Sequence, residues 1–296
     1  MINTTINFTN KKIRVLCIDN KNELVYLNEE DSPIDFSEDI SVYDGNENLI
    51  NELSEIILDI FKEGNVSPLS AKIILDVNQF FINSIPVETF EPDSVKSYIV
   101  WDLSNFYPDT YKNYIINYHK VLTQENPFSE FKLLTFAVKS NTVKFINDII
   151  NKCNFKTERL DIDLFSSFNV VKVKNSSGRY LILNCYKNRI DYIICNNNDI
   201  LCYEYLYFKE NNFDIELETN IKLLNINKYF PEVKNIYITG EEYSEYVVNE
   251  IKSYYPDLNV NLLNFDETLK LSNTFSNTDL INKYGYKFIS LAGAVI

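Results

Sequence analysis

Residues 12–27 read KIRVLCIDNKNELVYL and contain two apolar segments on either side of a polar turn. Lys12–Asp19 is apolar and β-branched, which favours a strand, and Glu23–Leu27 is a second segment of the same kind. The residues between them, Asn20–Asn22, are typical of a tight turn. The stretch therefore predicts a β-hairpin, with Asp19 at the point where the first strand ends.

A similar strand-rich opening returns in the second half of the chain. A three-stranded meander is predicted at Tyr180–Asn184, Arg189–Cys195 and Ile200–Phe208. Apolar residues at helical spacing follow each opening, at Leu49–Ile60 and at Ser244–Ser253. The sequence therefore predicts two similar α/β lobes, with the small polar residues of Lys174–Gly178 as the boundary.

Further elements are predicted from the apolar patterns in the rest of the chain. Strands are expected at Ala71–Val77, Phe80–Ile85, Tyr114–Leu122, Phe131–Val138, Asn235–Thr239 and Asn259–Leu263, with an extended segment at Asn154–Asp161. Helices are expected at Asp93–Asn105, Val143–Cys153, Ile162–Asn169 and Ile221–Tyr229. The last residues, Phe288–Ile296, are apolar and small, which predicts a close-packed terminal element.

The composition limits the classes of function. The chain has 296 residues, of which 45% are hydrophobic and 24% charged, so it is long and apolar enough to bury sizeable cores. Its net charge of -14 repels nucleic-acid backbones and anionic membranes, and neither is expected as a partner. No apolar run approaches the roughly 20 residues that span a bilayer.

Few residues have the spacing that catalysis or metal binding requires. The five cysteines have no close metal-ligand spacing, so no metal site is predicted. His119 is the only histidine, and its half-polar strand pattern predicts a surface position. No serine or cysteine has another histidine for a relay, so we predict no catalytic residue of the hydrolase-triad type.

The order of the segments resembles that of the actin-like ATPase superfamily, and within it the PilM family of type IV pilus assembly proteins, relatives of the division protein FtsA. The matching segments are Ile13–Leu27 (first phosphate hairpin), Val87–Leu122 (inserted subdomain), Leu133–Asp163 (strand–helix–strand), Ser177–Tyr207 (second phosphate hairpin), Ile236–Gly240 (adenosine strand) and Leu291–Ala294 (closing LAGA). The resemblance implies a two-lobed, ribonuclease H-like α/β fold. Its first lobe would be residues 1–175, with an inserted subdomain at about 87–161, and its second lobe 176–296.

Three residues mark where the resemblance places a nucleotide: Asp19, Asn184 and Gly240. Nucleotide-binding members have DIG-type turns and a Gly-Gly pair there, but this chain reads Asp19-Asn20-Lys21, Asn184-Cys185-Tyr186 and Gly240-Glu241-Glu242. The missing glycines remove space beside the phosphates, and two glutamates repel a triphosphate. The resemblance therefore implies a vestigial nucleotide site and a pseudo-ATPase without a cofactor. ATP with Mg²⁺ would be a ligand only if the altered site has kept some affinity for nucleotide.

Two alternatives stay open at this site. Asp19 either positions a metal-bound water or, as an aspartate after a strand, caps its own turn. An active ATPase or kinase with an atypical phosphate loop would have the same fold, because a fold alone does not define an activity.

An aromatic group lies in the segment that resembles the inserted subdomain: Trp101, Phe106, Tyr107 and Tyr111. These side chains either pack in the core and at the boundary of the subdomain, or line a groove that binds a peptide. PilM-family proteins bind the N-terminal cytoplasmic tail of the inner-membrane protein PilN. The resemblance therefore implies a PilN-like tail as the partner, docked near the inserted subdomain, and the aromatic density of this stretch indicates these four residues as the binding site.

The function implied is a non-catalytic cytoplasmic scaffold of a type IV pilus or type II secretion-like inner-membrane assembly. The resemblance implies membrane association only through the partner, because secretion-type relatives carry a membrane helix after the actin-like part and this sequence stops at Ile296 without one. An actin-like protein outside pili remains a third possibility. Glu29–Glu63 carries twelve carboxylates and one lysine, and it is either a solvated face or a surface that steers a basic tail.

Overall fold

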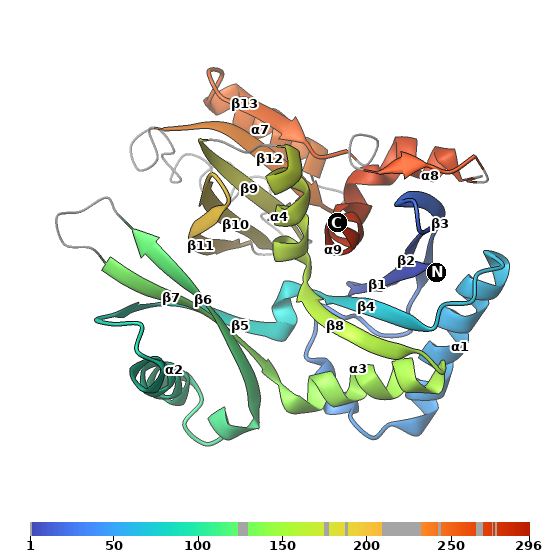
Figure 1. Cartoon of the computed structure of the whole chain (residues 1–296), viewed down its shortest axis with the longest axis horizontal. Helices are drawn as coiled ribbons and strands as arrows, with labels where there is room; N and C mark the ends of the chain where they lie inside the picture. The colour runs from blue at the N-terminus through green and yellow to red at the C-terminus, as the bar shows by residue number, and fades with distance from the viewer. Residues whose placement is uncertain are drawn as a thin grey trace. The chain divides into compact units, whose positions relative to one another are not determined.

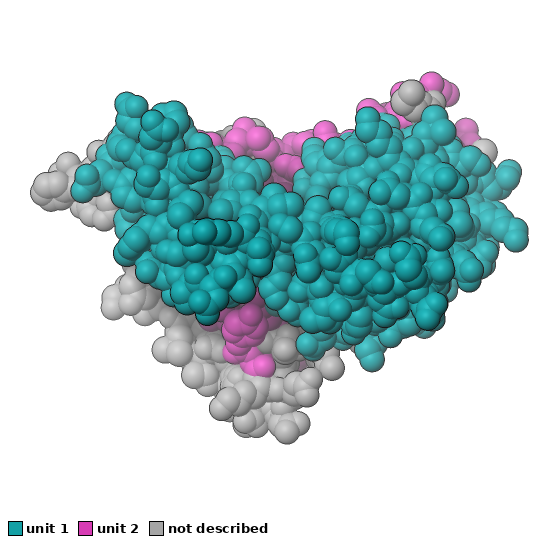
Figure 2. All heavy atoms as spheres, turned by 90° about the horizontal axis from the view of Figure 1, so that it is seen from below, with its two compact units in different colours: residues 1–17, 26–162 teal, residues 18–25, 163–296 magenta. Residues whose placement is uncertain are grey.

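The computed structural model describes residues 2–123, 130–174, 178–186, 189–208, 232–241, 244–264, 269–273, 275 and 277–296. The chain divides into two compact units, which Figure 2 shows in separate colours. Unit 1 consists of Met1–Cys17 and Tyr26–Ile162, and unit 2 of Ile18–Val25 and Asp163–Ile296. The predicted strand-rich openings at Lys12 and Tyr180 belong to two different sheets.

Unit 1 contains a sheet with the strand order β3-β2-β1-β4-β8. These strands are β1 (Asn3–Thr9), β2 (Lys12–Ile18), β3 (Glu23–Asp31), β4 (Ser70–Leu75) and β8 (Lys156–Ile162). Both β1 and β8 run parallel to β4. Strand β2 is buried from Ile13 to Ile18, which explains its mostly apolar sequence, because a strand covered on both faces has no solvent side. The charged residue in this run, Arg14, is paired with Glu29.

Two helices lie side by side on one face of this sheet (Figure 1). They are α1 (Glu47–Glu63) and α3 (Ser140–Lys152). Helix α1 begins at Asn46, whose side-chain oxygen accepts the Leu49 N–H at 3.2 Å. Its buried residues recur every three to four positions and face α3, where the Ser54 hydroxyl donates to the Ile149 carbonyl at 3.2 Å.

A second, smaller sheet in unit 1 has the order β5-β7-β6 and is antiparallel. It is built from β5 (Phe80–Val87), β6 (Tyr114–Thr123) and β7 (Glu130–Lys139), with helix α2 (Pro92–Phe106) on one face. Val95 and Ile99 of α2 pack against Ile85, Val87 and Leu133. Pro86 fits into β5 because β5 is an edge strand, where a missing N–H breaks no ladder bond.

The insertion differs in extent from the predicted 87–161. Its separate sheet begins at Phe80 and ends at Lys139. The next segment, Ser140–Ile162, forms α3 and β8, and β8 pairs with β4 of the main sheet. The predicted start is late because β5, which includes Pro86 and Val87, already belongs to the separate sheet, and a proline is tolerated on an edge strand.

Unit 2 contains a five-stranded sheet with the order β11-β10-β9-β12-β13. The strands are β9 (Arg179–Cys185), β10 (Arg189–Asn196), β11 (Asp199–Tyr207), β12 (Val233–Gly240) and β13 (Asn259–Leu262). Strands β9, β10 and β11 form the predicted antiparallel meander, and β12 runs parallel to both β9 and β13. A short strand, β14 (Lys270–Leu271), pairs with the start of β3 at Glu23 and Leu24.

Helix α7 (Ser244–Tyr254) covers one face of this sheet, with Val247, Val248 and Ile251 in the same core as the β9 and β12 side chains. Within the described residues, unit 2 also has the helices α4 (Asp163–Lys174), α8 (Thr278–Tyr284) and α9 (Ile289–Val295). Single 3-10 turns lie at Ile40–Tyr43, Val77–Gln79, Tyr111–Asn113 and Gly285–Phe288.

The boundary between the units falls at Ile162/Asp163 and not at the predicted 175/176. Helix α4 belongs to unit 2 because it packs closely on α9. A Cβ atom at Gly293 would lie 1.8 Å from the Ser166 carbonyl oxygen, and Asn169 donates to the Gly293 carbonyl at 3.0 Å. The predicted helix Ile221–Tyr229 lies outside the described residues.

Candidate functional site

The turn of the first hairpin uses Asp19 as its cap. One carboxylate oxygen accepts the backbone N–H groups of Lys21 at 2.8 Å and Glu23 at 3.0 Å, and the Asp19 N–H donates to the Glu23 carbonyl at 2.9 Å. The Glu23 N–H, with help from that of Lys21, holds the pKa of Asp19 below its usual value. Asn22 has φ +61°, a conformation that asparagine tolerates. These bonds account for Asp19 without a bound metal or nucleotide.

The second hairpin is closed by a buried hydrogen-bond chain. The Asn184 amide nitrogen donates to the Tyr186 hydroxyl at 2.6 Å, and that hydroxyl donates to Asp163 Oδ1 at 2.6 Å. The same Asp163 oxygen accepts the Leu164 N–H at 2.8 Å at the start of α4. The chain therefore joins strand β9, the turn after it and the first residue of α4.

Tyr186 stands at the position where the resemblance predicts a phosphate-binding glycine. Its side chain is 2% exposed, and its hydroxyl lies between Asn184 and Asp163. A glycine leaves room for a phosphate oxygen beside the backbone, whereas a phenol ring fills that room. The hydroxyl also occupies the polar groups of Asn184 and Asp163 to which a phosphate or a metal-bound water could bond.

Gly240 is held by close backbone packing. It has φ +113°, and a Cβ atom there would lie 2.3 Å from the Cys185 carbonyl oxygen and 2.6 Å from Asn184 Oδ1. The Cys185 carbonyl accepts the Glu241 N–H at 2.8 Å. Glycine is thus required by the contact between β9 and β12. Glu242, the second glutamate predicted to repel a triphosphate, lies outside the described residues.

The structure therefore brings together two of the three predicted nucleotide residues, Asn184 and Gly240, while Asp19 belongs to the other hairpin. Sequence reasoning did not identify Asp163 as part of this group. The available signal was its position, a carboxylate at the first residue of a helix directly after a strand.

A buried charged cluster lies next to Asn184 on the same sheet. Asp191 is directly opposite Asn184 across β9 and β10, and it accepts Arg189 Nη2 at 2.7 Å and the Tyr203 hydroxyl at 2.5 Å. The Arg189 guanidinium carbon also lies 5.0 Å from the centre of the Tyr207 ring. Sequence reasoning missed this cluster because its members are spread over two strands.

The four predicted partner-binding aromatics separate into different environments. Trp101 and Phe106 are 63% and 58% exposed on α2. The Phe106 ring lies 4.9 Å from Phe81, whose other neighbour, Tyr107, is 5.5 Å away. Tyr107 also stacks on Tyr114 at 5.0 Å, and Tyr111 is half-buried beyond the end of α2. Phe106 and Tyr107 thus belong to a row of contacting rings, the aromatic seam, together with Phe81 and Tyr114. Trp101 lies outside this row.

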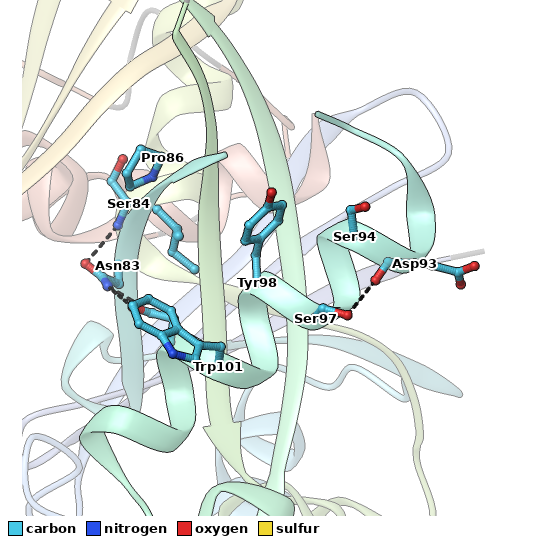
Figure 3. Close-up of a pocket in the computed structure, with 10 residues that line it drawn as sticks. Asn83, Ser84, Pro86, Asp93, Ser94, Ser97, Tyr98 and Trp101 are labelled. Atoms are coloured by element: carbon cyan, nitrogen blue, oxygen red, sulfur yellow. Dashed lines mark hydrogen bonds between the residues drawn. The ribbon is translucent and has the colours of Figure 1, made fainter. Parts of the chain in front are cut away.

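Trp101 lines a groove of about 940 Å³ between α2 and the outer edge of β5 (Figure 3). Strand β5 contributes Asn83, Ser84, Ile85 and Pro86, and α2 contributes Asp93, Ser94, Ser97, Tyr98, Trp101 and Asp102. Sequence reasoning found only Trp101 among these ten. Asp102 lies seven residues after Val95, on the same buried face, and a charged residue on an apolar helix stripe was the missed signal.

A second pocket, of about 300 Å³, lies beside the stacked rings of Tyr107 and Tyr114. Tyr107, Tyr114 and Lys139 line it together with residues of the first 3-10 turn and α3. Lys139 forms an ion pair there with Asp39. Of the four predicted aromatic residues, Trp101 lines the first pocket and Tyr107 lines the second.

The acidic stretch Glu29–Glu63 is partly neutralised by the protein itself. Glu29 pairs with Arg14 at 2.9 Å, Asp31 with Lys12 at 2.8 Å and Asp44 with Lys144 at 2.6 Å, and Asp39 pairs with Lys139. The exposed pairs among them, such as Asp31 with Lys12, contribute little to stability, but all four pairs reduce the field that a distant partner senses.

Other chemistry is limited in the part of the chain that the structure describes. His119 is exposed on β6, as predicted. No group of three or more histidine, cysteine or acidic side chains among the described residues is arranged to hold a metal ion. Of the described helices, none has both the length and the apolar composition needed to cross a membrane.

Comparison with known proteins identifies the fold. No protein-family model matches this sequence, and no curated protein is significantly similar to it. A chain of the solved PilM–PilN type IV pilus biogenesis complex matches with a TM-score of 0.79 and 10% identity, over 99% of this chain and 97% of that one. The cytoplasmic domain of EpsL, an inner-membrane component of the type II secretion system of Vibrio cholerae, matches with a TM-score of 0.53 and 10% identity, over 100% and 95%.

The ethanolamine utilization protein EutJ from Carboxydothermus hydrogenoformans matches with a TM-score of 0.53 and 7% identity, over 99% of this chain and 88% of that chain. The protein therefore has the actin-like ATPase fold, and the resemblance to PilM that the sequence predicted is confirmed at the level of the fold. At these identities the likeness concerns the fold alone.

Proposed function

We propose that this protein is a non-catalytic cytoplasmic scaffold of a type IV pilus or type II secretion-like inner-membrane assembly, and that it binds the cytoplasmic tail of a bitopic membrane protein. The main support is the likeness to a chain of the PilM–PilN complex, because it extends over 99% of this chain and 97% of that chain. Because the two structures align over nearly their whole lengths, the likeness includes the insertion as well as the two sheets common to the fold.

The second hairpin supports the non-catalytic part of the proposal. Tyr186 fills the position of the expected glycine, and its hydroxyl bonds both Asn184 and Asp163. A nucleotide would have to displace a buried tyrosine and break two buried hydrogen bonds, each of which contributes about 0.5–1.5 kcal/mol or more when a charged group takes part. The alternative, an ATPase or kinase with an atypical phosphate loop, requires that displacement.

The insertion supports the partner-binding part. Its helix α2 exposes Trp101 and Phe106, and large exposed aromatic side chains are typical of protein interfaces. Tyr107 and Tyr111 follow directly and complete the proposed contact surface. The acidic stretch Glu29–Glu63 has a secondary role in this proposal, since its own lysine and arginine partners take up part of its charge.

The test uses the full chain and synthetic peptides with the N-terminal tails of bitopic membrane proteins encoded beside its gene. We expect one tail to bind in a fluorescence titration, and Phe106→Ala and Tyr111→Ala to weaken it by about tenfold each. Tyr118→Ala, an exposed tyrosine on β6, is the matched control and should leave the affinity unchanged. Failure of every tail to bind would overturn the scaffold proposal.

Calorimetry separates the scaffold from the enzyme. The scaffold proposal expects no saturable heat with ATP and Mg²⁺ at micromolar protein and no phosphate release. Saturable, Mg²⁺-dependent binding would instead support the alternative of an active ATPase or kinase.

A further inference from the structure

The outer edge of β5 offers few backbone donors to an incoming strand. The Ser84 N–H is bonded at 3.0 Å to the side-chain oxygen of Asn83, so it does not take part in the ladder with β7. Alternate residues of a strand point their backbone groups in the same direction, so Pro86 faces outward like Ser84, and Pro86 has no N–H. This edge is therefore poorly suited to pairing with a partner strand, although it lines the 940 Å³ groove.

Inside the groove is a buried carboxylate. Asp102 is only 8% exposed, and both of its oxygens accept the Asn83 amide nitrogen, at 3.0 and 2.9 Å. Among the residues that the structure describes, no lysine, arginine or histidine forms an ion pair with it. Buried aspartates are rare unless they are paired with a cation, so Asp102 is available to a cation from a partner.

Apolar side chains line the groove close to this carboxylate. Trp101, the residue before Asp102, is 63% exposed, and Tyr98, Ile85 and Pro86 also line the groove. Asp93 adds a second carboxylate from the first turn of α2. Figure 3 shows Asn83, Ser84 and Pro86 of β5 facing Tyr98 and Trp101 of α2. The lining thus combines an apolar surface with negative charge.

We propose that this groove binds a partner segment through its side chains, with an arginine or lysine bonded to Asp102 and a neighbouring apolar side chain on Trp101, and without adding a strand to β5. This inference rests on the proposed function, and it names the chemistry of the tail: apolar residues alternating with basic ones. Charge complementarity selects the cation, and the blocked edge excludes β-augmentation.

Asn83 links the closed edge of β5 to the buried carboxylate of Asp102. Its side-chain oxygen holds the Ser84 N–H while its amide nitrogen holds the Asp102 carboxylate. The carboxylate has further lone pairs, so a partner cation bonds Asp102 without displacing Asn83. The strand edge therefore stays closed while the groove is filled.

The probe is intrinsic fluorescence, because Trp101 is the only tryptophan of the chain and lines the groove. The full chain is titrated with an acetylated, amidated peptide of alternating leucine and arginine. We expect a saturable blue shift of the emission as the indole leaves water, and a weaker affinity at high salt. Peptides with glutamate or citrulline in place of arginine, or serine in place of leucine, should bind at least about tenfold more weakly.

Asp102→Asn removes the charge and keeps the size of the side chain, so we expect it to weaken the leucine–arginine peptide by about tenfold or more. Asp109→Asn, an exposed aspartate after α2 that does not line the groove, is the matched control and should bind as the wild type. The citrulline peptide removes the cation from the peptide and so tests the same contact in the wild-type protein. The contact can therefore be tested even if the Asp102→Asn variant folds poorly.

A peptide methylated on alternate backbone nitrogens tests the mode of binding. Side-chain docking predicts that it binds within about threefold of the parent peptide, whereas strand addition requires those N–H groups and predicts loss of binding. Equal binding of the arginine and citrulline peptides, no change in Trp101 emission, or loss of binding on methylation would each overturn the inference.

The same variants separate this inference from the proposed function. If a membrane-protein tail binds but Asp102→Asn has no effect on it, the scaffold stands and the groove assignment is wrong. If the leucine–arginine peptide binds in an Asp102-dependent way while no tail binds, the groove assignment stands and the proposed function is wrong.

Discussion

Tyr186 is the residue that most directly closes the second hairpin to a nucleotide. Tyr186→Phe keeps the ring and removes the hydroxyl that joins Asn184 to Asp163. Two buried polar groups then lose a partner, so we expect the free energy of unfolding to fall by about 1–3 kcal/mol in a denaturant titration. Tyr205→Phe, a half-exposed tyrosine on β11, is the control, with an expected change within about 0.5 kcal/mol. Equal effects of the two substitutions would show that the hydrogen-bond chain is unimportant.

Asp19 gives a prediction with a definite pH dependence. Turn N–H groups, that of Glu23 first, depress its pKa in the folded state, so its stabilising effect is full above the unfolded value of about 3.9. The effect is lost as the pH falls through the lower folded value. We expect Asp19→Asn to destabilise the protein near neutral pH and to differ less from wild type at about pH 3. Thermal unfolding across this range measures it.

A constant difference between Asp19→Asn and wild type at all pH values would contradict the role of the carboxylate charge in the turn. Asp109→Asn removes an exposed carboxylate outside this turn and serves as the control.

Burial decides which thiols react. Burial raises the pKa of Cys17 to about 12 and of Cys153 to about 11, whereas Cys202 is half-exposed. At mildly alkaline pH we therefore expect alkylating reagents to label Cys202 first in the folded protein, as read by peptide mass spectrometry. All five cysteines should react in denaturant. Early labelling of Cys17 would mean that the first hairpin opens readily.

At the scale of elements, the contact of α4 with α9 depends on one glycine. Gly293→Ala would raise intrinsic helix propensity by about 1 kcal/mol, but the added Cβ would meet the Ser166 carbonyl oxygen at 1.8 Å. Backbone cannot yield as a flexible side chain does, so we expect a net loss of about 1–3 kcal/mol in denaturant unfolding. Asn282→Ala, an exposed position on α8, is the control and should change little. A stabilised Gly293→Ala protein would contradict the close packing of the helices.

Elements with a clear apolar period were predictable from the sequence. The hairpin of β2 and β3, helix α1 and the meander β9–β11 lie close to their predicted bounds, because their apolar spacing matches the faces they bury. Strand β1 was missed: Asn3–Thr9 is polar, yet Thr5 and Asn7 are buried in the sheet. Polar residues buried by tertiary structure give no apolar pattern.

The candidate sites were less predictable than the fold, for a physical reason. Asn184 and Gly240 could be placed from local motifs, but the group that closes the hairpin joins Tyr186 to Asp163, 23 residues earlier. In the same way, the groove at Trp101 needs Asn83 and Asp102, which come from different elements. Contacts between side chains far apart in sequence leave no periodic signal in a single chain.

For the molecule as a whole, the proposed scaffold does not bind a nucleotide, so ATP should not stabilise its folded state. A ligand at 100 times its Kd stabilises the folded state by about 2.7 kcal/mol. For a chain of this size each kcal/mol shifts Tm by roughly 2–4 °C, so a functional nucleotide site would be evident in a thermal scan. We expect millimolar ATP with Mg²⁺ to leave Tm unchanged, since Tyr186 fills the turn and the net charge of -14 repels the triphosphate.

The double variant Asn184→Asp/Tyr186→Gly tests the cause of that result. It restores the carboxylate and the glycine that the resemblance assigns to nucleotide-binding members, and it removes the phenol that bonds Asp163. If the tyrosine is what closes the site, ATP with Mg²⁺ should raise the Tm of the variant above that of its nucleotide-free form, while wild type stays unchanged. A rise in wild-type Tm that saturates with ATP would instead show that the hairpin opens to admit a nucleotide, and it would support the alternative of an active ATPase or kinase.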